Sequence, residues 1–372
     1  MIQQFTVSRD DSIYEAFPDV ALTASGRLVC VFAECTHHGD REYTRIVVCD
    51  STDRGRTWSA KRALTEPLHK STDHAHWNCA RITALSDGRL AVVVDRISGR
   101  NEGADQAGRQ ENVLFFSDDD GARWDGPHPA PVEGIVPDQL VELKCGEHAG
   151  RWLITAHTVT GSRVNPTWRQ RVWYSDDQGT TWSEPIVIAA EPLLRLCEGS
   201  IVELPAGELV CFMRENSGQG YDAHKSISTD GGATWSTPVA FPIPACHRPV
   251  AGVLGSGHVL IAHRFMQGGA GWVGWWTQNL FAAWADVGSC LAPRRCDAHA
   301  RIMPVAYDRS PASDTGYCGW AQLDDGEIYL VNYVLDDAPR AQIRGYAFAE
   351  TDIVLDPQAE LGWRPADAKG RT

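Results

Sequence analysis

One eight-residue pattern, Ser-x-Asp-x-Gly-x-Thr/Arg-Trp, occurs four times in the chain and constrains the fold more than any other feature. The copies start 66, 58 and 53 residues apart, which identifies an internal repeat. The Asp can accept hydrogen bonds from the backbone of a tight turn, the Gly permits a positive φ, and the Trp can cover neighbouring strands. Each copy therefore predicts a structural corner between two strands. The copies are Ser51–Trp58, Ser117–Trp124, Ser175–Trp182 and Ser228–Trp235.

A second repeat places a glycine before an apolar segment of strand length, and it occurs six times. Spacings of 62, 62, 57, 50 and 69 residues separate these glycines. A short apolar stretch precedes most of them, and a polar loop with a third stretch follows, so each unit predicts four antiparallel strands. Six units predict an all-β fold, a six-bladed β-propeller formed as a single domain by residues 1–372. A two-sheet sandwich is the alternative, but six near-equal repeats fit it poorly. The glycines are Gly26, Gly88, Gly150, Gly207, Gly257 and Gly326.

The charge balance and the cysteine pattern narrow the function classes. A formal net charge of −14 argues against general binding to nucleic acid, which needs a basic surface. Eleven cysteines stand singly, mostly within apolar runs, which favours free thiols in a cytoplasmic protein. No secretory signal is visible at the start, and no run approaches the roughly 18 apolar residues of a membrane span, so no membrane partner is expected. The pairs His37/His38 and His74/His76 lack a third ligand at metal spacing, so no metal is expected.

Polar residues gather at one end of the predicted strand pairs. The innermost strand of each unit runs antiparallel to its neighbour, so the start of the first and the end of the second meet at one face. Nearly all twelve positions there hold a charged residue, His, Asn, Gln or Tyr, whereas the opposite ends are plain turns. We therefore expect a polar pocket at one mouth of the propeller, with ion pairing at a rim as the alternative. The candidate substrate-binding residues are Asp19, Asn78, Arg81, Arg96, Gln139, Arg214, His247, Arg248 and Arg264.

The corners and the six units resemble the sialidase (neuraminidase) superfamily over essentially the whole chain. The segment from Cys197-Glu198 to Arg214 is similar to the family's fourth-blade strands, which carry a catalytic Glu and a carboxylate-binding Arg. The segment beginning at Tyr317 is similar to the strand that opens with the family's nucleophilic Tyr. The resemblance implies that Tyr317 is the nucleophile, Glu198 its base and Arg214 a ligand of the substrate carboxylate. A phenol with a pKa near 10 needs such a base to act as a nucleophile.

The resemblance also implies an acid/base residue on the first long loop. In addition, one arginine that the family has in its first blade is absent from this chain. Asp40 takes the place of the family's acid/base Asp, with His38 as the reserve candidate. Where the family opens its first blade with Arg-Ile-Pro, this chain has Ala16-Phe17-Pro18, so the first carboxylate-binding Arg is missing. The family's third Arg has no firm counterpart, and Arg248 and Arg264 are the candidates for it. Because a bidentate Arg–carboxylate contact is hard to replace, the missing Arg argues against sialic acid itself as the substrate and indicates a rebuilt substrate pocket.

Three functions are compatible with this pattern. An exo-acting glycoside hydrolase would remove a terminal, acidic sugar with retention of configuration through Tyr317. A lyase on the same scaffold would use Tyr317 or His247 to take the proton next to a uronate carboxylate, with an Arg stabilising the charge that develops. A carbohydrate-binding propeller would carry out no chemistry. The Glu198–Tyr317 pair favours hydrolysis of a small, anionic carbohydrate without a cofactor, and the oligomeric state stays open.

Overall fold

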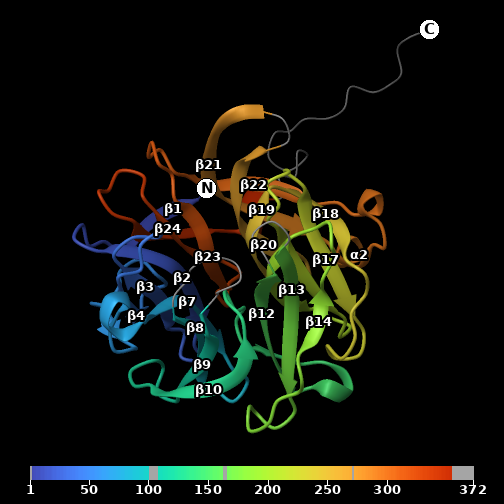
Figure 1. Cartoon of the computed structure of the whole chain (residues 1–372), viewed down its shortest axis with the longest axis horizontal. Helices are drawn as coiled ribbons and strands as arrows, with labels where there is room; N and C mark the ends of the chain where they lie inside the picture. The colour runs from blue at the N-terminus through green and yellow to red at the C-terminus, as the bar shows by residue number, and fades with distance from the viewer. Residues whose placement is uncertain (1, 100–107, 162–165, 270–271, 354–372) are drawn as a thin grey trace.

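The computed structural model describes residues 2–99, 108–161, 166–269 and 272–353. Its strands form six antiparallel sheets that surround one axis as the blades of a propeller (Figure 1), which confirms the predicted all-β, six-bladed fold. Each blade has four strands, and β6 adds a short fifth strand to blade 1. The single-domain assignment for residues 1–372 stays a prediction.

The first three blades follow the chain from the axis outward. Blade 1 contains β2 (Tyr14–Leu22), β3 (Leu28–Cys35), β4 (Tyr43–Ser51), β5 (Arg62–Ala63) and β6 (Leu68–His69). Blade 2 contains β7 (Ala75–Ala84), β8 (Leu90–Ser98), β9 (Gln110–Ser117) and β10 (Asp125–Glu133). Blade 3 contains β11 (Val141–Glu142), β12 (Trp152–Gly161), β13 (Pro166–Ser175) and β14 (Ile186–Ala189). The short helices α1 (Lys70–Asp73) and η2 (Gly146–His148) lie in the connections of this half.

The last three blades continue in the same order. Blade 4 contains β15 (Leu196–Glu203), β16 (Leu209–Glu215), β17 (Asp222–Ser228) and β18 (Val239–Pro244). Blade 5 contains β19 (Cys246–Val253), β20 (Val259–Gly269), β21 (Trp272–Ala285) and β22 (Arg301–Tyr307), and β20 and β21 form a long hairpin that projects from the ring (Figure 1). Blade 6 contains β23 (Thr315–Gln322), β24 (Ile328–Val334) and β25 (Gln342–Phe348). The short helices α2 (Val287–Leu291), η3 (Arg295–Asp297) and α3 (Glu350–Ile353) lie beside these blades.

The N-terminal strand closes the ring. Strand β1 (Gln3–Ser8) pairs antiparallel with β25 and becomes the outermost strand of blade 6. The first and last segments of the chain therefore share one sheet, so that the ring is held shut by backbone hydrogen bonds as well as by packing. Blade 6 has no corner repeat, so no local motif in the sequence marks which segment supplies its outer strand.

The repeated corners have the predicted geometry. In the first copy, Ser51 Oγ accepts a hydrogen bond from Gly55 N (2.8 Å), and Asp53 Oδ1 accepts one from Thr57 N (2.9 Å). The indole of Trp58 donates to Gly55 O (3.1 Å), so the ring folds back over the turn. The same three contacts recur in the other three copies. The backbone of Gly55 has a φ of 80°, which explains the glycine.

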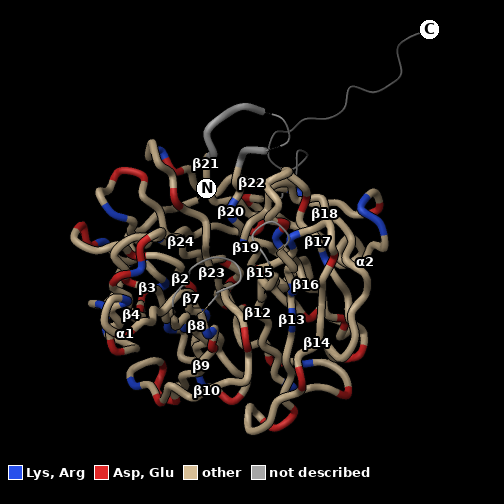
Figure 2. The backbone as a smooth tube through the Cα atoms, viewed as in Figure 1, with Lys and Arg blue, Asp and Glu red and all other residues tan. Residues whose placement is uncertain are grey.

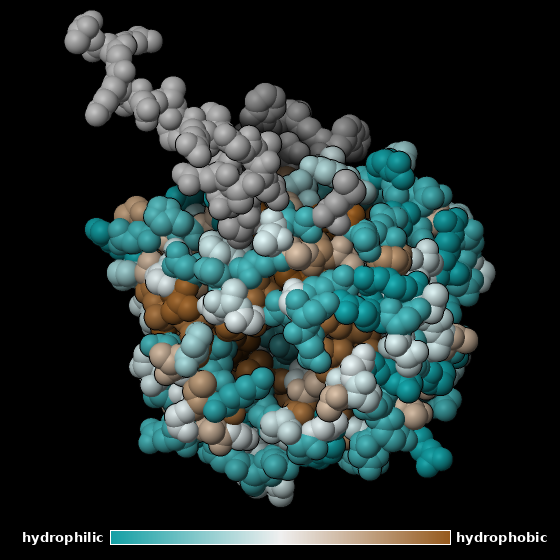
Figure 3. Space-filling model, turned by 180° about the vertical axis from the view of Figure 1, so that it is seen from behind, coloured by the Kyte–Doolittle hydropathy of each residue, from teal (hydrophilic) through white to brown (hydrophobic). Residues whose placement is uncertain are grey.

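The axis has two ends of different character. We call the upper mouth the end at which the innermost strands begin, and the lower mouth the end at which they finish. At the lower mouth, residues from all six blades line a largely apolar hollow of about 510 Å³ (Figure 3). Acidic and basic residues are interspersed along the outer turns (Figure 2). All eleven cysteines are free thiols.

The described residues contain neither a membrane-spanning helix nor a metal-binding cluster. Among them, no helix is both long and apolar enough to cross a membrane. No group of three or more His, Cys, Asp or Glu side chains in the described ranges is arranged to hold a metal ion.

Candidate active site

The innermost strands of five blades carry a β-bulge close to the upper mouth. In each bulge two consecutive residues face a single residue of the neighbouring strand. In four of the bulges the first residue has a positive φ: 56° at Phe17, 50° at Glu198, 51° at Arg248 and 98° at Gly316. A bulge bends its strand and re-aims its side chains, and bulges are common beside active sites. The bulged pairs are residues 17–18, 78–79, 198–199, 248–249 and 316–317.

Tyr317 and Glu198, which lie on the bulges of blades 6 and 4, are in direct contact. The Tyr317 hydroxyl donates a short hydrogen bond to Glu198 Oε1. Arg214, on the strand next to Glu198, donates from Nη1 to Glu198 Oε1 (2.9 Å) and to Tyr317 Oη (3.1 Å). Its Nη2 donates to Asn216 Oδ1 (2.5 Å), which fixes the guanidinium. The three residues singled out by the resemblance therefore form one hydrogen-bonded cluster.

The charges around this cluster set its protonation. Burial raises the pKa of Glu198, but Arg214, Arg264 and His157 outweigh that effect and hold the pKa far below its usual range. Burial raises the pKa of Tyr317, and the Glu198 charge raises it further. The resting pair is thus a phenol facing a carboxylate, and Glu198 is the group able to receive the phenol's proton.

Two further arginines and a histidine surround the Tyr317 ring. The guanidinium of Arg264 lies 4.5 Å from the ring centroid, and that of Arg248 lies 5.7 Å from it. Arg264 Nη2 approaches both Tyr317 Oη (3.5 Å) and His247 Nδ1 (3.4 Å). Burial first, and then the charges of Arg214 and Arg264, lower the pKa of His247 to about 2, so this imidazole is neutral. The structure therefore brings together all three of these predicted binding residues.

Deeper along the axis, Arg81 and Asp19 form a buried ionic contact. Arg81 Nη1 lies 3.2 Å from Asp19 Oδ1 and donates to Cys318 O (3.0 Å), while Nη2 lies 3.5 Å from Asp138. Asp19 also accepts from Ile82 N (2.8 Å), which ties blade 1 to blade 2. Burial raises the pKa of Asp19 to about 6 despite the opposing charge of Arg81. The side chain of Arg81 is only 1% exposed, so these two predicted binding residues connect neighbouring blades in the interior of the ring.

Arg41 and Asn78 form one wall of the upper mouth. Arg41 lies over the ring of Phe17, 4.7 Å from its centroid, and donates from Nη2 to Asn78 Oδ1 (3.2 Å). Asn78 in turn donates to Asp95 Oδ2 (2.8 Å). The buried Nη1 of Arg41 has no hydrogen-bond partner among the described residues. Phe17 also contacts Tyr317, with ring centroids 5.5 Å apart, so this wall adjoins the Tyr317 cluster.

The two acid/base candidates on the loop between β3 and β4 have different surroundings. Asp40 is exposed, and its Oδ1 accepts a hydrogen bond from Glu42 N (3.0 Å) within the same loop. His38 is half-buried, bonds Asp314 through Nδ1 (2.6 Å) and packs edge-on against Phe17. His38 therefore contacts Phe17, an aromatic ring that in turn contacts Tyr317. The structure shows no such contact for Asp40 among the residues it describes.

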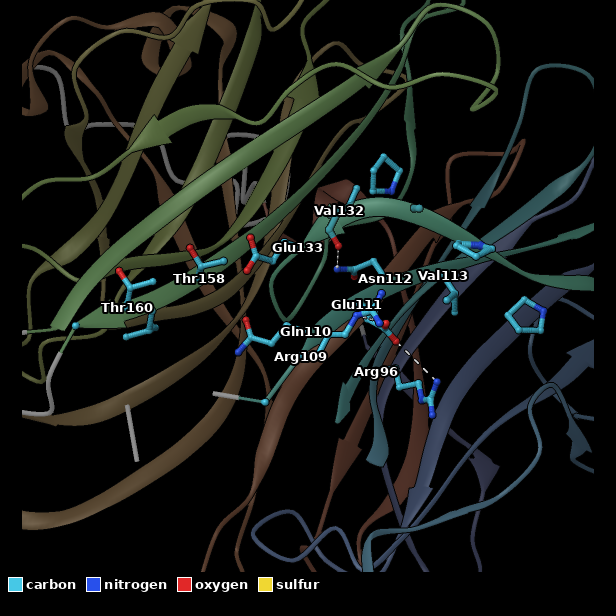
Figure 4. Close-up of a pocket in the computed structure, with 17 residues that line it drawn as sticks. Arg96, Arg109, Gln110, Glu111, Asn112, Val113, Val132, Glu133, Thr158 and Thr160 are labelled. Atoms are coloured by element: carbon cyan, nitrogen blue, oxygen red, sulfur yellow. Dashed lines mark hydrogen bonds and ion pairs between the residues drawn. The ribbon is translucent and has the colours of Figure 1, made fainter. Parts of the chain in front are cut away.

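Two predicted binding residues lie away from the Tyr317 cluster. Arg96 lines a separate cavity of about 730 Å³ between blades 2 and 3 (Figure 4), where it forms an ion pair with Glu111 (3.8 Å). Gln139 lines the hollow at the lower mouth. Arg96 directly follows Asp95, and Gln139 directly follows Asp138; both aspartates face the axis. Because side chains alternate along an extended backbone, a shift of one residue turns the side chain to the opposite side.

Sequence reasoning gave no role to several residues that contact this centre. His157 accepts a hydrogen bond from Glu198 N (3.4 Å) and stacks on Trp168, and burial lowers its pKa to about 4. His157 stands near the end of the second strand of blade 3, a position that in other blades holds candidate site residues, and this position could have identified it. Asp314 and Arg41 lie in loops, where the strand repeat provides no register.

The fold and this cluster define a class of protein: a six-bladed, corner-repeat propeller of the sialidase type, with a Tyr–Glu–Arg centre at one mouth. Residues 26–268 match the BNR repeat-like domain family, and the chain belongs to that family.

Comparisons with characterised proteins agree with this class at low identity. The chain is 29% identical to an anhydrosialidase of Macrobdella decora over 137 residues, 34% of this chain and 16% of that protein. It is 26% identical to a sialidase of Bacteroides fragilis over 215 residues, 54% of this chain and 36% of that protein. The chain thus matches well under two thirds of the length of either relative.

Solved structures share the fold. A protein of unknown function from Dyadobacter fermentans superposes with a TM-score of 0.72 at 20% identity, covering 93% of this chain and 98% of that one. The intramolecular trans-sialidase of Ruminococcus gnavus, solved with oseltamivir carboxylate, superposes with a TM-score of 0.66 at 14% identity, covering 92% and 96%. At these identities the likeness is one of architecture.

Proposed function

We propose that the protein is an exo-acting glycoside hydrolase that removes a terminal, acidic sugar with retention of configuration. The observation that carries this proposal is the hydrogen bond from the Tyr317 hydroxyl to the ionised Glu198, held by Arg214. As Tyr317 Oη attacks the anomeric carbon, its proton passes to Glu198 and the bond to the leaving oxygen breaks. Water then attacks the glycosyl-enzyme, and Tyr317 Oη recovers its proton from Glu198.

A neutral nucleophile suits an anionic sugar. A carboxylate nucleophile would repel a carboxylate attached to or near the carbon under attack, whereas the Tyr317 phenol approaches it uncharged. Four arginines adjoin the cluster: Arg214, Arg248 and Arg264 at Tyr317, and Arg41 across Phe17. They can bind acidic and hydroxyl groups of a sugar through charge-assisted hydrogen bonds. The carboxylate ligand named with the Ruminococcus gnavus structure supports an acidic sugar.

Arg41 can supply the guanidinium that the first blade lacks. The family's arginine would stand at Ala16, directly before the Phe17 on which Arg41 lies. Arg41 reaches the same wall from a loop, and its buried Nη1 has no hydrogen-bond partner among the described residues. This relocation supports a changed geometry at the substrate's acidic group, which argues against sialic acid itself as the substrate.

A second candidate is a uronate lyase, and the position of His247 favours it. The neutral imidazole shares Arg264 with Tyr317, so an imidazole and a phenol flank one cation that could stabilise a developing enolate. Product chemistry separates the two candidates. A lyase leaves an unsaturated sugar that absorbs in the near ultraviolet, whereas a hydrolase leaves a saturated reducing sugar.

The test is a panel of aryl glycosides and oligosaccharides that includes sialosides and uronides. We expect release of a saturated, acidic monosaccharide by the wild type, with the same anomeric configuration in the first product seen by NMR. Unsaturated product would replace the hydrolase with the lyase. Tight binding of acidic sugars without any product would contradict both enzymes and leave a carbohydrate-binding propeller.

A further inference from the structure

His38 and Asp314 form a dyad beside the Tyr317 cluster, although they are 276 residues apart in the chain. His38 Nδ1 lies 2.6 Å from Asp314 Oδ2. The same carboxylate accepts hydrogen bonds from the hydroxyls of Tyr14 (2.5 Å) and Tyr333 (2.6 Å), so three donors fix its position. Asp314 precedes Tyr317 by three residues at the start of blade 6, which places the dyad and the phenol at the same mouth.

The protonation of Asp314 determines which nitrogen of His38 can exchange a proton. Burial raises the pKa of Asp314, but the bonds from His38, Tyr14 and Tyr333 outweigh it and lower that pKa below its usual range. An ionised carboxylate only accepts hydrogen bonds, so His38 Nδ1 must carry a proton. The atom left to gain or lose a proton is Nε2.

The His38 ring adjoins two aromatic rings that contact Tyr317. It packs edge-on against Phe17, with centroids 5.1 Å apart, and lies 6.4 Å from Tyr333. Both of these rings contact Tyr317, at 5.5 and 6.5 Å. The His38 side chain is 37% exposed, so a bound sugar's leaving group can reach it, whereas Asp314 behind it is 12% exposed.

We infer that His38, oriented by Asp314, is the general acid and base of the reaction, in place of Asp40. This inference rests on the proposed glycosidase function. In the first step Nε2–H gives its proton to the glycosidic oxygen as the C–O bond breaks and a glycosidic bond forms between Tyr317 Oη and the anomeric carbon. In the second step neutral Nε2 takes a proton from the attacking water. His38 is then again protonated, and no external reactant besides water is consumed.

The charged groups around His38 are compatible with this cycle. Asp314, from blade 6, brings one negative charge to His38, and Asp308 lies behind it, accepting from Asp314 N (3.0 Å). Arg41, on the same loop as His38, brings one positive charge and donates to the His38 carbonyl (3.0 Å). Tyr14 and Tyr333 bring only neutral hydroxyls, since burial raises the pKa of both. The Asp40 carboxylate is engaged with its own loop.

The experiment compares His38→Gln, Asp40→Asn and His37→Gln on two substrates with the same sugar, one with a nitrophenol and one with an alkyl alcohol as leaving group. General acid catalysis is worth roughly 100- to 10,000-fold, and an alkoxide needs it while a nitrophenolate hardly does. We expect the His38→Gln substitution to lower kcat/KM for the alkyl substrate at least about 100-fold more than it lowers kcat/KM for the nitrophenyl substrate. His37→Gln, which removes the neighbouring exposed imidazole, should show no such difference. The inference would be overturned if Asp40→Asn selectively lowered the rate on the alkyl substrate, or if His38→Gln lowered the rates on both substrates equally.

A second readout does not depend on turnover. Nitrogen-15 NMR of labelled histidines should show neutral His38 protonated at Nδ1, and Asp314→Asn should mix the two tautomers. A neutral His38 protonated at Nε2 in the wild type would overturn the dyad. A wild type that shows the Nδ1 tautomer but cleaves neither substrate would instead overturn the proposed hydrolase.

Discussion

At Glu198 the backbone φ is 50°, a left-handed conformation that costs a residue with a side chain about 1–2 kcal/mol. The same conformation recurs at Phe17 and Arg248, at the equivalent bulges of two other blades. Strain of this kind persists only where the surrounding structure holds it, and it is common at functional sites. The bulges explain how strand-start residues of different blades converge on one cluster.

The sequence located this cluster because its residues stand at a fixed place in each repeat. Glu198, Arg214 and Tyr317 each begin or end an apolar strand, and strand pairing brings those ends to one mouth. Gln139 and Arg96 occupied similar places but point elsewhere, because each stands one residue away from the position that faces the axis. Pro18 and Pro249, at the second bulged positions, were the available signal, since proline inside a strand favours a bulge.

Replacing Arg41 tests whether a loop residue has taken the place of the missing first-blade arginine. We expect Arg41→Ala to raise KM for the acidic substrate by about 10- to 100-fold, since one hydrogen bond to a charged group is worth about 1.5–3 kcal/mol. The value of kcat should change less, and Arg41→Lys should restore part of the binding. Steady-state kinetics measure both. An unchanged KM in Arg41→Ala would exclude Arg41 from substrate binding.

Asp19 makes a prediction about pH and stability. Its folded pKa of about 6 lies above the ordinary value of 3.8, so the folded protein binds this proton more tightly than the unfolded chain. The stability that this group contributes is therefore full below about pH 4 and is lost as the pH rises through 6. Urea unfolding of the wild type and Asp19→Asn should show their difference in unfolding free energy falling over that range. A difference independent of pH would contradict the shifted pKa.

At the scale of the element, the corner repeat is the best-predicted part of the molecule. Its side chains bond to backbone groups within eight residues, so the geometry follows from local sequence alone. The loops at the upper mouth depend on contacts between blades, and local sequence does not specify those. That is why the corners were predicted in detail while His38–Asp314 was not.

Two glycines with the same backbone separate conformational strain from packing. Gly55 and Gly26 have φ of 80° and 82°, but an added Cβ would overlap the Tyr329 ring at Gly55 and meet nothing within 4 Å at Gly26. We expect Gly26→Ala to destabilise the fold by about 1–2 kcal/mol from strain alone. Gly55→Ala should cost about 1–3 kcal/mol more through overpacking. Denaturant unfolding measures both free energies of unfolding, and an equal decrease in the two variants would show that the corner tolerates the methyl group.

At the scale of the whole molecule, the ring and its six blades could be predicted from spacing, but its closure could not. Strand β1 carries no repeat motif, and its partner β25 lies more than 330 residues further along the chain, at Ile343 to Ala347. Val7 nevertheless belongs to the main hydrophobic cluster, together with residues of blades 1, 2 and 6.

Removing β1 tests its role in closure. A chain that starts after Ser8 would expose the edge of β25 and lose the burial of Val7, worth about 1.5–3 kcal/mol by itself. We expect a lower melting temperature and a tendency to associate through the open edge, measured by calorimetry and light scattering. A melting temperature equal to that of the full chain would show that blade 6 is complete with three strands.

The central claim is that Tyr317 becomes covalently bound to a sugar with Glu198 as its base, and trapping that intermediate tests it most directly. The probe is the acidic sugar released in the substrate panel, carrying a fluoride leaving group and a second fluorine beside the anomeric carbon to slow the second step. Peptide mapping by mass spectrometry should place one added glycosyl group on Tyr317, with no adduct in Tyr317→Phe. Turnover of natural substrate by Tyr317→Phe at the wild-type rate, or an adduct on another residue, would contradict the account.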